Sequence, residues 1–231
     1  MIEAVLFDLG GTLVRYYDRR QFPDILRDAI TRVQLKLQIE GELKVEPDTV
    51  WLRVREEDYE SEDYRVRPLE DRLIRIFELH DADADTLMEH CRTFMEPIFA
   101  LGRLYDDAIP ILRELTSMGV KTAIVSNTPW GSPAELWREE MKLLGLKRLT
   151  DALIFCRDVG WRKPARQVFE LALEMMDSTP DQCLFVGDNP KWDVIGPESV
   201  GIEAVLIQRE EGPNNLVTNT IGSLQEIFEK I

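Results

Sequence analysis

The sequence is poor in the residues that build disulfide or zinc frameworks. Its 231 residues include only three cysteines, at positions 91, 156 and 183, and two histidines. An odd number of widely spaced cysteines argues against a disulfide-stabilised secreted domain, and free thiols fit a reducing compartment. A secretory leader pattern is not found, and no apolar run reaches the roughly 18 residues that a membrane helix needs. We therefore expect a cytoplasmic protein without a membrane partner.

Positive charge is also scarce. The chain has 28 Lys and Arg but 43 Asp and Glu, which gives a formal net charge of −15. Nucleic acids and anionic membranes bind basic surfaces, so neither is expected as a main partner. Hydrophobic residues make up 44% of the chain, which is enough for a packed core and excludes disorder of the whole chain. A monomer or a homodimer is expected.

Short apolar runs recur along the chain, and each ends at a polar or glycine-containing turn. They cover residues 2–7, 120–125, 152–155, 183–186 and 203–207. Between and after them, apolar side chains repeat at helical spacing over residues 108–118, 134–144, 165–176 and 223–230. Strands that alternate with helices predict an α/β fold with a parallel sheet. In such sheets, ligands bind beyond the carboxyl ends of the strands.

Residues 16–100 break this alternation, because their apolar side chains repeat only at helical spacing. Helix-start signals lie near Pro23, Pro47 and residues 81–85, so we predict an insert of about four helices after the first strand. The expected division is a core of residues 1–15 and 101–231 and a helical domain of residues 16–100. His80 and His90 lie in the insert without metal-ligand spacing, and surface or packing roles are expected for them.

Polar side chains follow the predicted strand ends. Asp8 follows the first strand, Ser126 the second and Asp188 the fourth. Lys163 opens the predicted helix after the third strand, and Asp193 lies five residues beyond Asp188. Three carboxylates that converge at one place repel one another unless a cation is present. Mg²⁺ is the expected cation because it prefers hard oxygen ligands. A lysine and a divalent ion together suit a phosphoryl group, and a carboxylate beside them could form an aspartyl-phosphate.

Four short motifs carry a family resemblance. They read FDLGGTL at 7–13, SNT at 126–128, GWRKP at 160–164 and GDNPKWD at 187–193. In this order and at these strand ends, they resemble the four motifs of the haloacid dehalogenase (HAD) superfamily, and the helical insert resembles its C1 cap. The resemblance covers the whole chain. It implies a Rossmann-like sheet of strand order 5-4-1-2-3, with a mobile helical cap over the site.

The resemblance also implies a role for each motif residue. Asp8 would be the nucleophile. Asp8, the backbone carbonyl of Gly10 and Asp188 would bind Mg²⁺, and Asp193 would support the metal directly or through water.

The substrate would be held by the other motif residues. Ser126 and Asn127 would bind the phosphoryl oxygens, and Lys163 would balance the charge of the nucleophile and the phosphoryl group. Gly11 and Thr12 are expected beside the substrate, because the glycines after Asp8 allow the backbone to approach a ligand closely.

Gly10 departs from the pattern of HAD phosphatases, which usually carry a second Asp two residues after the nucleophile. That Asp protonates the leaving group, and such help is worth about 10²–10⁴ in rate. The resemblance therefore predicts a substrate with a good leaving group, an acid supplied by Tyr16, Tyr17 or Asp18, or a poor phosphatase.

The leading hypothesis is a Mg²⁺-dependent phosphatase that hydrolyses a small phosphorylated metabolite through an aspartyl-phosphate on Asp8. Two alternatives stay open. A metal-independent 2-haloacid dehalogenase also lacks the second Asp, although the acidic pair Asp188 and Asp193 argues against it. A non-catalytic, ligand-binding protein of the same fold is the other alternative.

Overall fold

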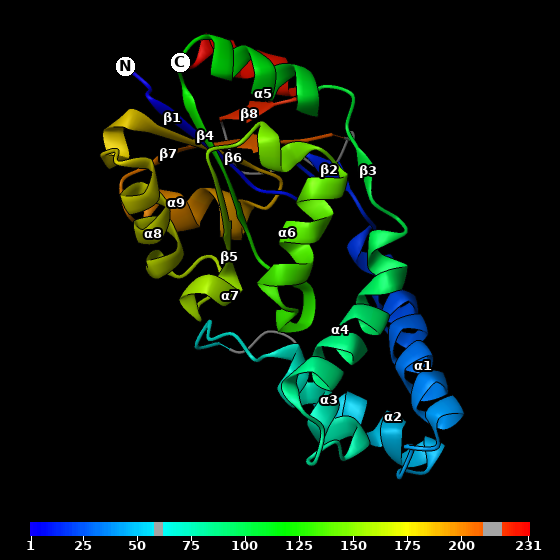
Figure 1. Ribbon diagram of the computed structural model, residues 1–231. Coiled ribbons are helices and arrows are strands. Elements are labelled where there is room, and N and C mark those ends of the chain that lie inside the picture. The colour runs from blue at the N-terminus through cyan, green and yellow to red at the C-terminus, as the bar shows by residue number, and fades with distance from the viewer. Residues whose placement is uncertain (58–61, 210–218) are drawn as a thin grey trace.

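The computed structural model describes residues 1–57, 62–209 and 219–231, and it has two parts (Figure 1). One is an α/β unit around a parallel sheet, and the other is a group of four helices to one side. The strands are β1 Ala4–Phe7, β2 Val14–Arg15, β3 Arg103–Leu104, β4 Lys121–Ser126, β5 Ala152–Phe155, β6 Cys183–Gly187, β7 Glu203–Ile207 and β8 Thr220–Ile221. The α-helices are α1 Phe22–Glu40, α2 Pro47–Glu56, α3 Leu69–Phe77, α4 Ala84–Phe99, α5 Ala108–Ser117, α6 Ala134–Leu143, α7 Cys156–Val159, α8 Arg166–Met176 and α9 Gly196–Glu198.

The main sheet has the order β5-β4-β1-β6-β7-β8. If β1, β4, β5, β6 and β7 are numbered 1 to 5 along the chain and the sheet is followed from β7 to β5, these strands have the predicted order 5-4-1-2-3. All their pairings are parallel. The sequence analysis missed β8, which has only two residues and extends the sheet beside β7. The last predicted helix also differs, because residues Leu224–Glu229 form a short 3-10 helix.

The central strand is buried on both faces, as expected for a parallel sheet covered by helices. Val5 and Phe7 of β1 belong to one apolar cluster, which includes residues of α5 and α6. Ala4 and Leu6 belong to a second cluster, which includes residues of α8. Alternate side chains of β1 thus belong to the two apolar clusters on opposite faces of the sheet, each shared with the helices that cover that face.

The four helices α1–α4 form the insert predicted between the first and second main strands. The chain enters it after β2 and leaves it at β3, and these two short strands pair antiparallel, with Val14 opposite Leu104. Asp83 caps α4 by accepting a hydrogen bond from the amide of Thr86 at 2.8 Å. α1 ends at Glu40 and is capped by Gly41, whose φ of 74° is the left-handed conformation that favours glycine.

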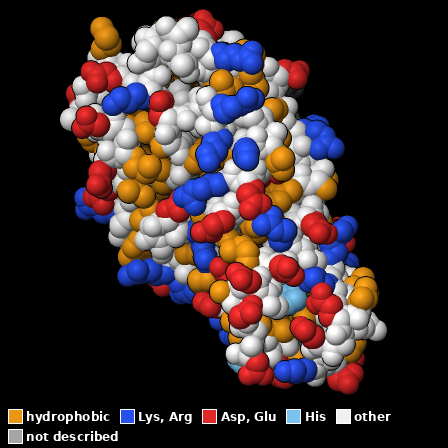
Figure 2. Space-filling model, in the orientation of Figure 1, with side chains coloured by type: hydrophobic (Ala, Val, Ile, Leu, Met, Phe, Trp, Pro, Cys, Tyr) orange, Lys and Arg blue, Asp and Glu red, His pale blue; other side chains and the backbone are white. Residues whose placement is uncertain are grey.

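Charged side chains of both signs are interspersed over the face of the molecule shown in Figure 2. Within the described ranges, no helix is both long and apolar enough to span a membrane.

Candidate active site

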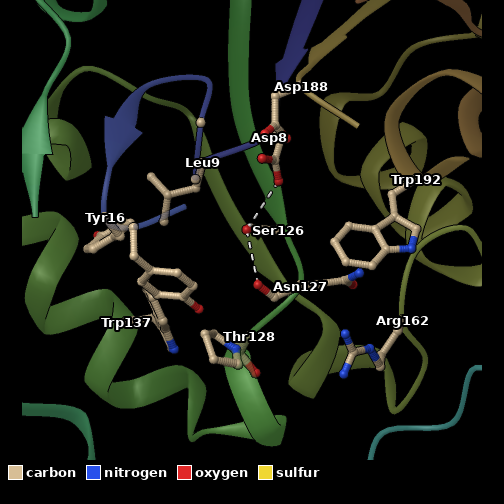
Figure 3. Close-up of a pocket in the computed structure, with 14 residues that line it drawn as sticks. Asp8, Leu9, Tyr16, Ser126, Asn127, Thr128, Trp137, Arg162, Asp188 and Trp192 are labelled. Carbon is tan, nitrogen blue, oxygen red and sulfur yellow. Dashed lines mark hydrogen bonds between the residues drawn. The ribbon is translucent and has the colours of Figure 1, made fainter. Parts of the chain in front are cut away.

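Three adjacent parallel strands bring the predicted site residues together. Asp8 follows β1, Ser126 ends β4 and Asp188 follows β6, and β1 pairs with both of the other strands. Because the carboxyl ends of these strands lie at one edge of the sheet, the three side chains face one pocket (Figure 3).

Lys163 is the buried cation of this site. Its Nζ donates hydrogen bonds to Oδ1 of Asp8 at 2.7 Å, to Oδ1 of Asp193 at 2.6 Å and to the carbonyl of Val125 at 2.9 Å. Burial alone would lower the pKa of Lys163, but the carboxylates of Asp193 and Asp8 raise it above its ordinary value. The ammonium is therefore charged, and it links Asp8, the nucleophile candidate, to Asp193 of the fourth motif.

The carboxylates of Asp8, Asp188 and Asp193 form a compact oxygen cluster. One oxygen of each lies within 4.8 Å of the others, with Asp8 and Asp193 buried and Asp188 exposed. Asp193 also accepts a hydrogen bond at Oδ2 from the amide of Asn189 at 2.9 Å. Burial raises the pKa of Asp193 to about 6, while Lys163 opposes this rise.

These three residues fit a divalent cation. All the donors are hard carboxylate oxygens, the set Mg²⁺ prefers, and the exposed side of Asp188 leaves room for the waters that Mg²⁺ keeps. The single ammonium of Lys163 offsets one of the three negative charges. The cluster thus carries the excess negative charge that a divalent ion would balance.

Ser126 and Asn127 both line the pocket, but in different ways. The Ser126 hydroxyl lies 3.3 Å from Oδ1 of Asp8, so it is within reach of a group bound at that carboxylate. The Asn127 side chain instead forms two hydrogen bonds with the main chain of Lys163, one as donor and one as acceptor. Its Nδ2 donates to the Lys163 carbonyl at 3.2 Å, and its Oδ1 accepts from the Lys163 amide at 2.8 Å. Asn127 therefore positions Lys163, a role that its motif alone did not indicate.

Of the three predicted residues in the turn after Asp8, Gly10 and Gly11 lie at the pocket and Thr12 is buried away from it. Gly11 has a φ of +83°, and a Cβ there would lie 2.2 Å from Oδ2 of Asp188, so only glycine fits. Thr12 is fully buried, and its amide donates to the carbonyl of Leu9 at 3.4 Å. The substrate contact predicted for Thr12 stays a prediction, since Thr12 is not among the described residues that line this pocket.

The pocket walls also contain residues outside the predicted catalytic, substrate-binding and metal-binding sets, and among them the sequence analysis named only Tyr16 and Tyr17, as candidate acids. The cavity has a volume of about 160 Å³, and its wall includes Tyr16, Tyr17, Trp137, Arg162 and Trp192. The rings of Tyr16 and Trp137 meet edge-to-face, with 5.6 Å between their centroids. Burial, with Glu140 and Tyr17 nearby, raises the pKa of Tyr16, which keeps its hydroxyl protonated.

The three predicted sources of a replacement acid are thus separated. Tyr16 and Tyr17 lie at the pocket, whereas Asp18 is exposed and accepts hydrogen bonds from Arg20, which lower its pKa.

Trp130, which follows the second motif, is buried and stacks on Phe94 instead of lining the pocket.

The helical insert also contacts the lysine loop directly. The Arg162 amide donates to the Tyr64 carbonyl at 2.8 Å, and the Val66 amide donates to the Gly160 carbonyl at 3.0 Å. The Arg65 guanidinium lies over the Trp161 ring, 3.7 Å from its centroid. The insert is therefore bound to the loop that carries Lys163, as well as to the sheet through β2 and β3.

Known proteins resemble this chain in sequence and in structure. A phosphoserine phosphatase of Thermus thermophilus is 31% identical over 67% of this chain, and the match spans 63% of that protein's own length. A glyceraldehyde 3-phosphate phosphatase of Methanothermobacter thermautotrophicus is 26% identical over 91% of this chain and 87% of its own. The crystal structure of a HAD phosphatase from Thermococcus onnurineus has a TM-score of 0.67 and 26% identity, and the match covers 99% of this chain and 97% of that one.

An (S)-2-haloacid dehalogenase of Pseudomonas sp. is 30% identical over 47% of this chain and 46% of its own. The family model for haloacid dehalogenase-like hydrolases matches residues 2–201, which include all four motifs and the helical insert. The chain therefore belongs to the haloacid dehalogenase-like hydrolase family.

Proposed function

We propose that this hydrolase is a Mg²⁺-dependent phosphatase that acts on a small phosphorylated metabolite. The observation that carries the proposal is the cluster of Asp8, Asp188 and Asp193 beside the pocket, with Lys163 bonded to Asp8 and Asp193. A metal-binding acidic cluster beside a buried ammonium is suited to neutralising a phosphoryl group. Relatives named as phosphatases over most of the chain support the same reaction class.

Each residue then has a defined task. Asp8, Asp188 and Asp193 would hold the metal, together with the Gly10 carbonyl that the family resemblance implies. Bound Mg²⁺ would neutralise the negative charge of the phosphoryl oxygens. A carboxylate oxygen of Asp8 attacks the phosphorus, the bond to the leaving group breaks, and an aspartyl-phosphate forms. Water then hydrolyses this intermediate, which releases phosphate and regenerates Asp8.

Lys163 and Ser126 support these steps from fixed positions. The Lys163 ammonium, 2.7 Å from Asp8, holds the nucleophile in place and offsets the charge that gathers there. The Ser126 hydroxyl, 3.3 Å from the same oxygen, is placed to donate to a phosphoryl oxygen. Asn127 fixes the loop that carries Lys163 through its two hydrogen bonds to the Lys163 main chain.

The substrate class follows from Gly10 and from the pocket walls. Because position 10 provides no acid, the leaving group departs without a proton from that side chain. An acyl phosphate or an anomeric phosphate satisfies this requirement better than an alkyl phosphate. A cavity of about 160 Å³ with aromatic walls and one arginine suits a small organic phosphate.

We also propose that residues 16–100 act as a cap over a core of residues 1–15 and 101–231. Tyr16 and Tyr17, at the start of the insert, line the pocket together with core residues. The contacts of Tyr64 and Val66 with the lysine loop hold the insert against the same side of the molecule.

Dehalogenation of a 2-haloacid is the second candidate, and Gly10 favours it because halide leaves without protonation. The two reactions are separated by two assays on the purified protein. Phosphate release from para-nitrophenyl phosphate with Mg²⁺, lost in EDTA, supports the phosphatase. Chloride release from 2-chloropropionate in EDTA, without phosphate release in Mg²⁺, would establish the dehalogenase instead. Ligand binding without turnover in either assay would indicate a non-catalytic protein.

A further inference from the structure

His90 of α4 lies in an unusual environment for a histidine. Its side chain is only 1% exposed, yet neither ring nitrogen has a hydrogen-bond partner within the described part of the chain. A buried polar group without a partner costs about 1–3 kcal/mol. Packing with the described residues leaves this cost uncompensated, so both ring nitrogens are available to bind a ligand.

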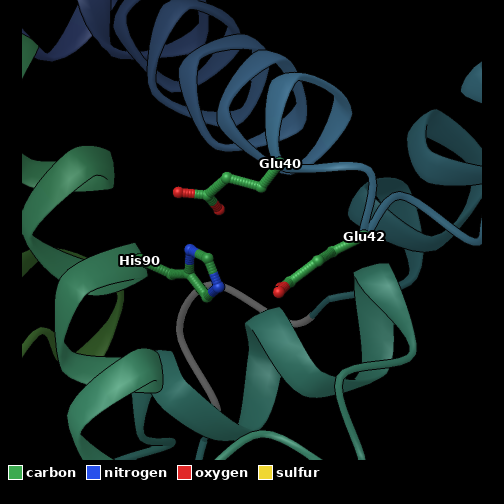
Figure 4. Close-up of side chains that lie close together, drawn as sticks. All are labelled: Glu40, Glu42 and His90. Atoms are coloured by element: carbon green, nitrogen blue, oxygen red, sulfur yellow. The ribbon is translucent and has the colours of Figure 1, made fainter.

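Two carboxylates face this imidazole from the end of α1. Glu40 is the last residue of α1, and Glu42 follows the left-handed Gly41. The turn is held by hydrogen bonds from the Gly41 amide to the Gln38 carbonyl at 3.2 Å and from the Glu42 amide to the Leu37 carbonyl at 2.8 Å. This turn directs both carboxylates toward His90 (Figure 4). One ligand atom of each of the three residues lies within 4.8 Å of the others.

We propose that Glu40, Glu42 and His90 form a Zn²⁺ site that joins the end of α1 to α4. Zinc bonds to imidazole nitrogen and carboxylate oxygen are about 2.0–2.2 Å long, so a modest closure of these donors would complete the site. One nitrogen and two oxygens fill three tetrahedral positions, and water would take the fourth. Imidazole favours zinc over Mg²⁺, which prefers oxygen ligands alone.

The charges around the imidazole agree with a metal ligand. Burial lowers the pKa of His90, Lys36 lowers it further, and Glu40, Glu42 and Glu89 oppose this shift. The ring is thus neutral, the form that binds a metal. Lys36 is the competing cation, since its Nζ lies 2.6 Å from Oε1 of Glu40. It also lies 3.7 Å from Glu89, toward which it can turn when a metal binds.

This site is separate from the pocket around Asp8. None of its three residues lines that pocket, and all three belong to the helical insert. Zinc here would stabilise the insert by linking α1 and α4, which already contact each other and bury Val33, Leu37, Cys91 and Phe94 in the same apolar cluster. The inference does not depend on the proposed phosphatase activity.

Calorimetric titration with Zn²⁺ tests the site, with the full chain in excess Mg²⁺ and an Asp188→Asn background that removes the acidic cluster as a competing site. We expect one zinc per chain. Glu42→Gln and Glu40→Gln should each weaken binding at least about tenfold, since even loss of an outer partner of a metal ligand costs about 10–100-fold. The control is Glu46→Gln, an exposed carboxylate of the same insert with the same charge change, which should bind zinc like the parent.

X-ray absorption at the zinc edge gives an independent readout, with one nitrogen and two carboxylate oxygens expected around the metal in addition to water. His90→Gln should remove the outer-shell scattering of the imidazole ring, and the two glutamate variants decide the question if this buried substitution prevents folding. No zinc binding by the parent, or equal binding by Glu42→Gln and Glu46→Gln, would overturn the proposal.

Discussion

The ammonium of Lys163 donates a hydrogen bond to Oδ1 of Asp8 at 2.7 Å, although the two residues are 155 positions apart in the sequence. The same nitrogen lies 2.6 Å from Oδ1 of Asp193, so one buried cation separates two buried carboxylates. This arrangement makes the stability of the site and its chemistry depend on one side chain.

Lys163→Met should therefore abolish phosphate release and destabilise the fold. Removing one partner of a buried ion pair costs about 3–5 kcal/mol, because the remaining charges are left unpaired. Urea unfolding measures the loss, and Mg²⁺ should reduce it by supplying another cation. Lys147→Met is the control, since Lys147 is exposed and should change stability little. Equal stability of the two variants would contradict the role given to Lys163.

Gly10→Asp tests the missing acid. Among the described residues, a Cβ at Gly10 would meet only Cδ2 of Tyr16, at 3.9 Å, which leaves room for a side chain. The added carboxyl should raise hydrolysis of alkyl phosphates by about 10²–10⁴, with little effect on para-nitrophenyl phosphate, whose phenolate leaves without a proton. Gly10→Asn has nearly the same shape but no acid and should show no gain. If both variants leave the alkyl phosphate rate unchanged, another residue already supplies the proton.

Gly11→Ala should disrupt the metal site, because its Cβ would overlap the carboxylate of Asp188 at 2.2 Å. Displacement of a site residue by about 1 Å can cost 10²-fold in rate. We expect a large rise in the Mg²⁺ concentration needed for half-maximal activity. Gly10→Ala is the matched control, with free space and an ordinary φ, and should resemble the parent. A normal Mg²⁺ requirement in Gly11→Ala would show that Asp188 does not bind the metal.

The strand-end residues were predictable from sequence, whereas the pocket wall was not. Asp8 and Asp188 follow apolar runs that form adjacent parallel strands, so local pattern and fold class together place them at one edge. Arg162 lies in a loop and Trp192 in the π-helical turn Pro190–Ile195, and the direction of both side chains depends on tertiary contacts that the neighbouring motif residues do not reveal.

The pairing of His90 with Glu40 shows the same limit. These residues are 50 positions apart on two helices whose packing, and not their spacing, brings them together. The packing role expected for His90 rested on its distance from other metal-ligand residues along the chain. The end of α1 at Gly41 could be read from the glycine, but the helix against which it packs could not.

Glu140→Gln should change how stability depends on pH. Burial raises the pKa of Glu140 in the folded state, above the unfolded value of about 4.3. Its contribution to stability is therefore fully present below that unfolded value and is lost as the pH rises through the folded pKa. Relative to the parent, Glu140→Gln should gain unfolding free energy as the pH rises above the unfolded value of about 4.3, measured by urea titration at several pH values.

The neighbouring Glu139→Gln is a control of opposite sign. Hydrogen bonds from Arg92 lower the pKa of Glu139, so its contribution is present above the unfolded value and is lost as the pH falls. Relative to the parent, this variant should be less stable above the unfolded value of about 4.3, and the difference should shrink as the pH falls below it. The same pH trend in both variants would contradict the buried, unpaired environment of Glu140.

Phosphate release by Asp8→Asn tests the central claim most directly. With Mg²⁺ and para-nitrophenyl phosphate, loss of the nucleophile should lower the rate on the order of 10⁴-fold or more, with the thermal unfolding midpoint showing that the variant is folded. Asp106→Asn, at an exposed aspartate, should keep the parent rate. Substantial Mg²⁺-dependent turnover by Asp8→Asn would contradict an aspartyl-phosphate on Asp8.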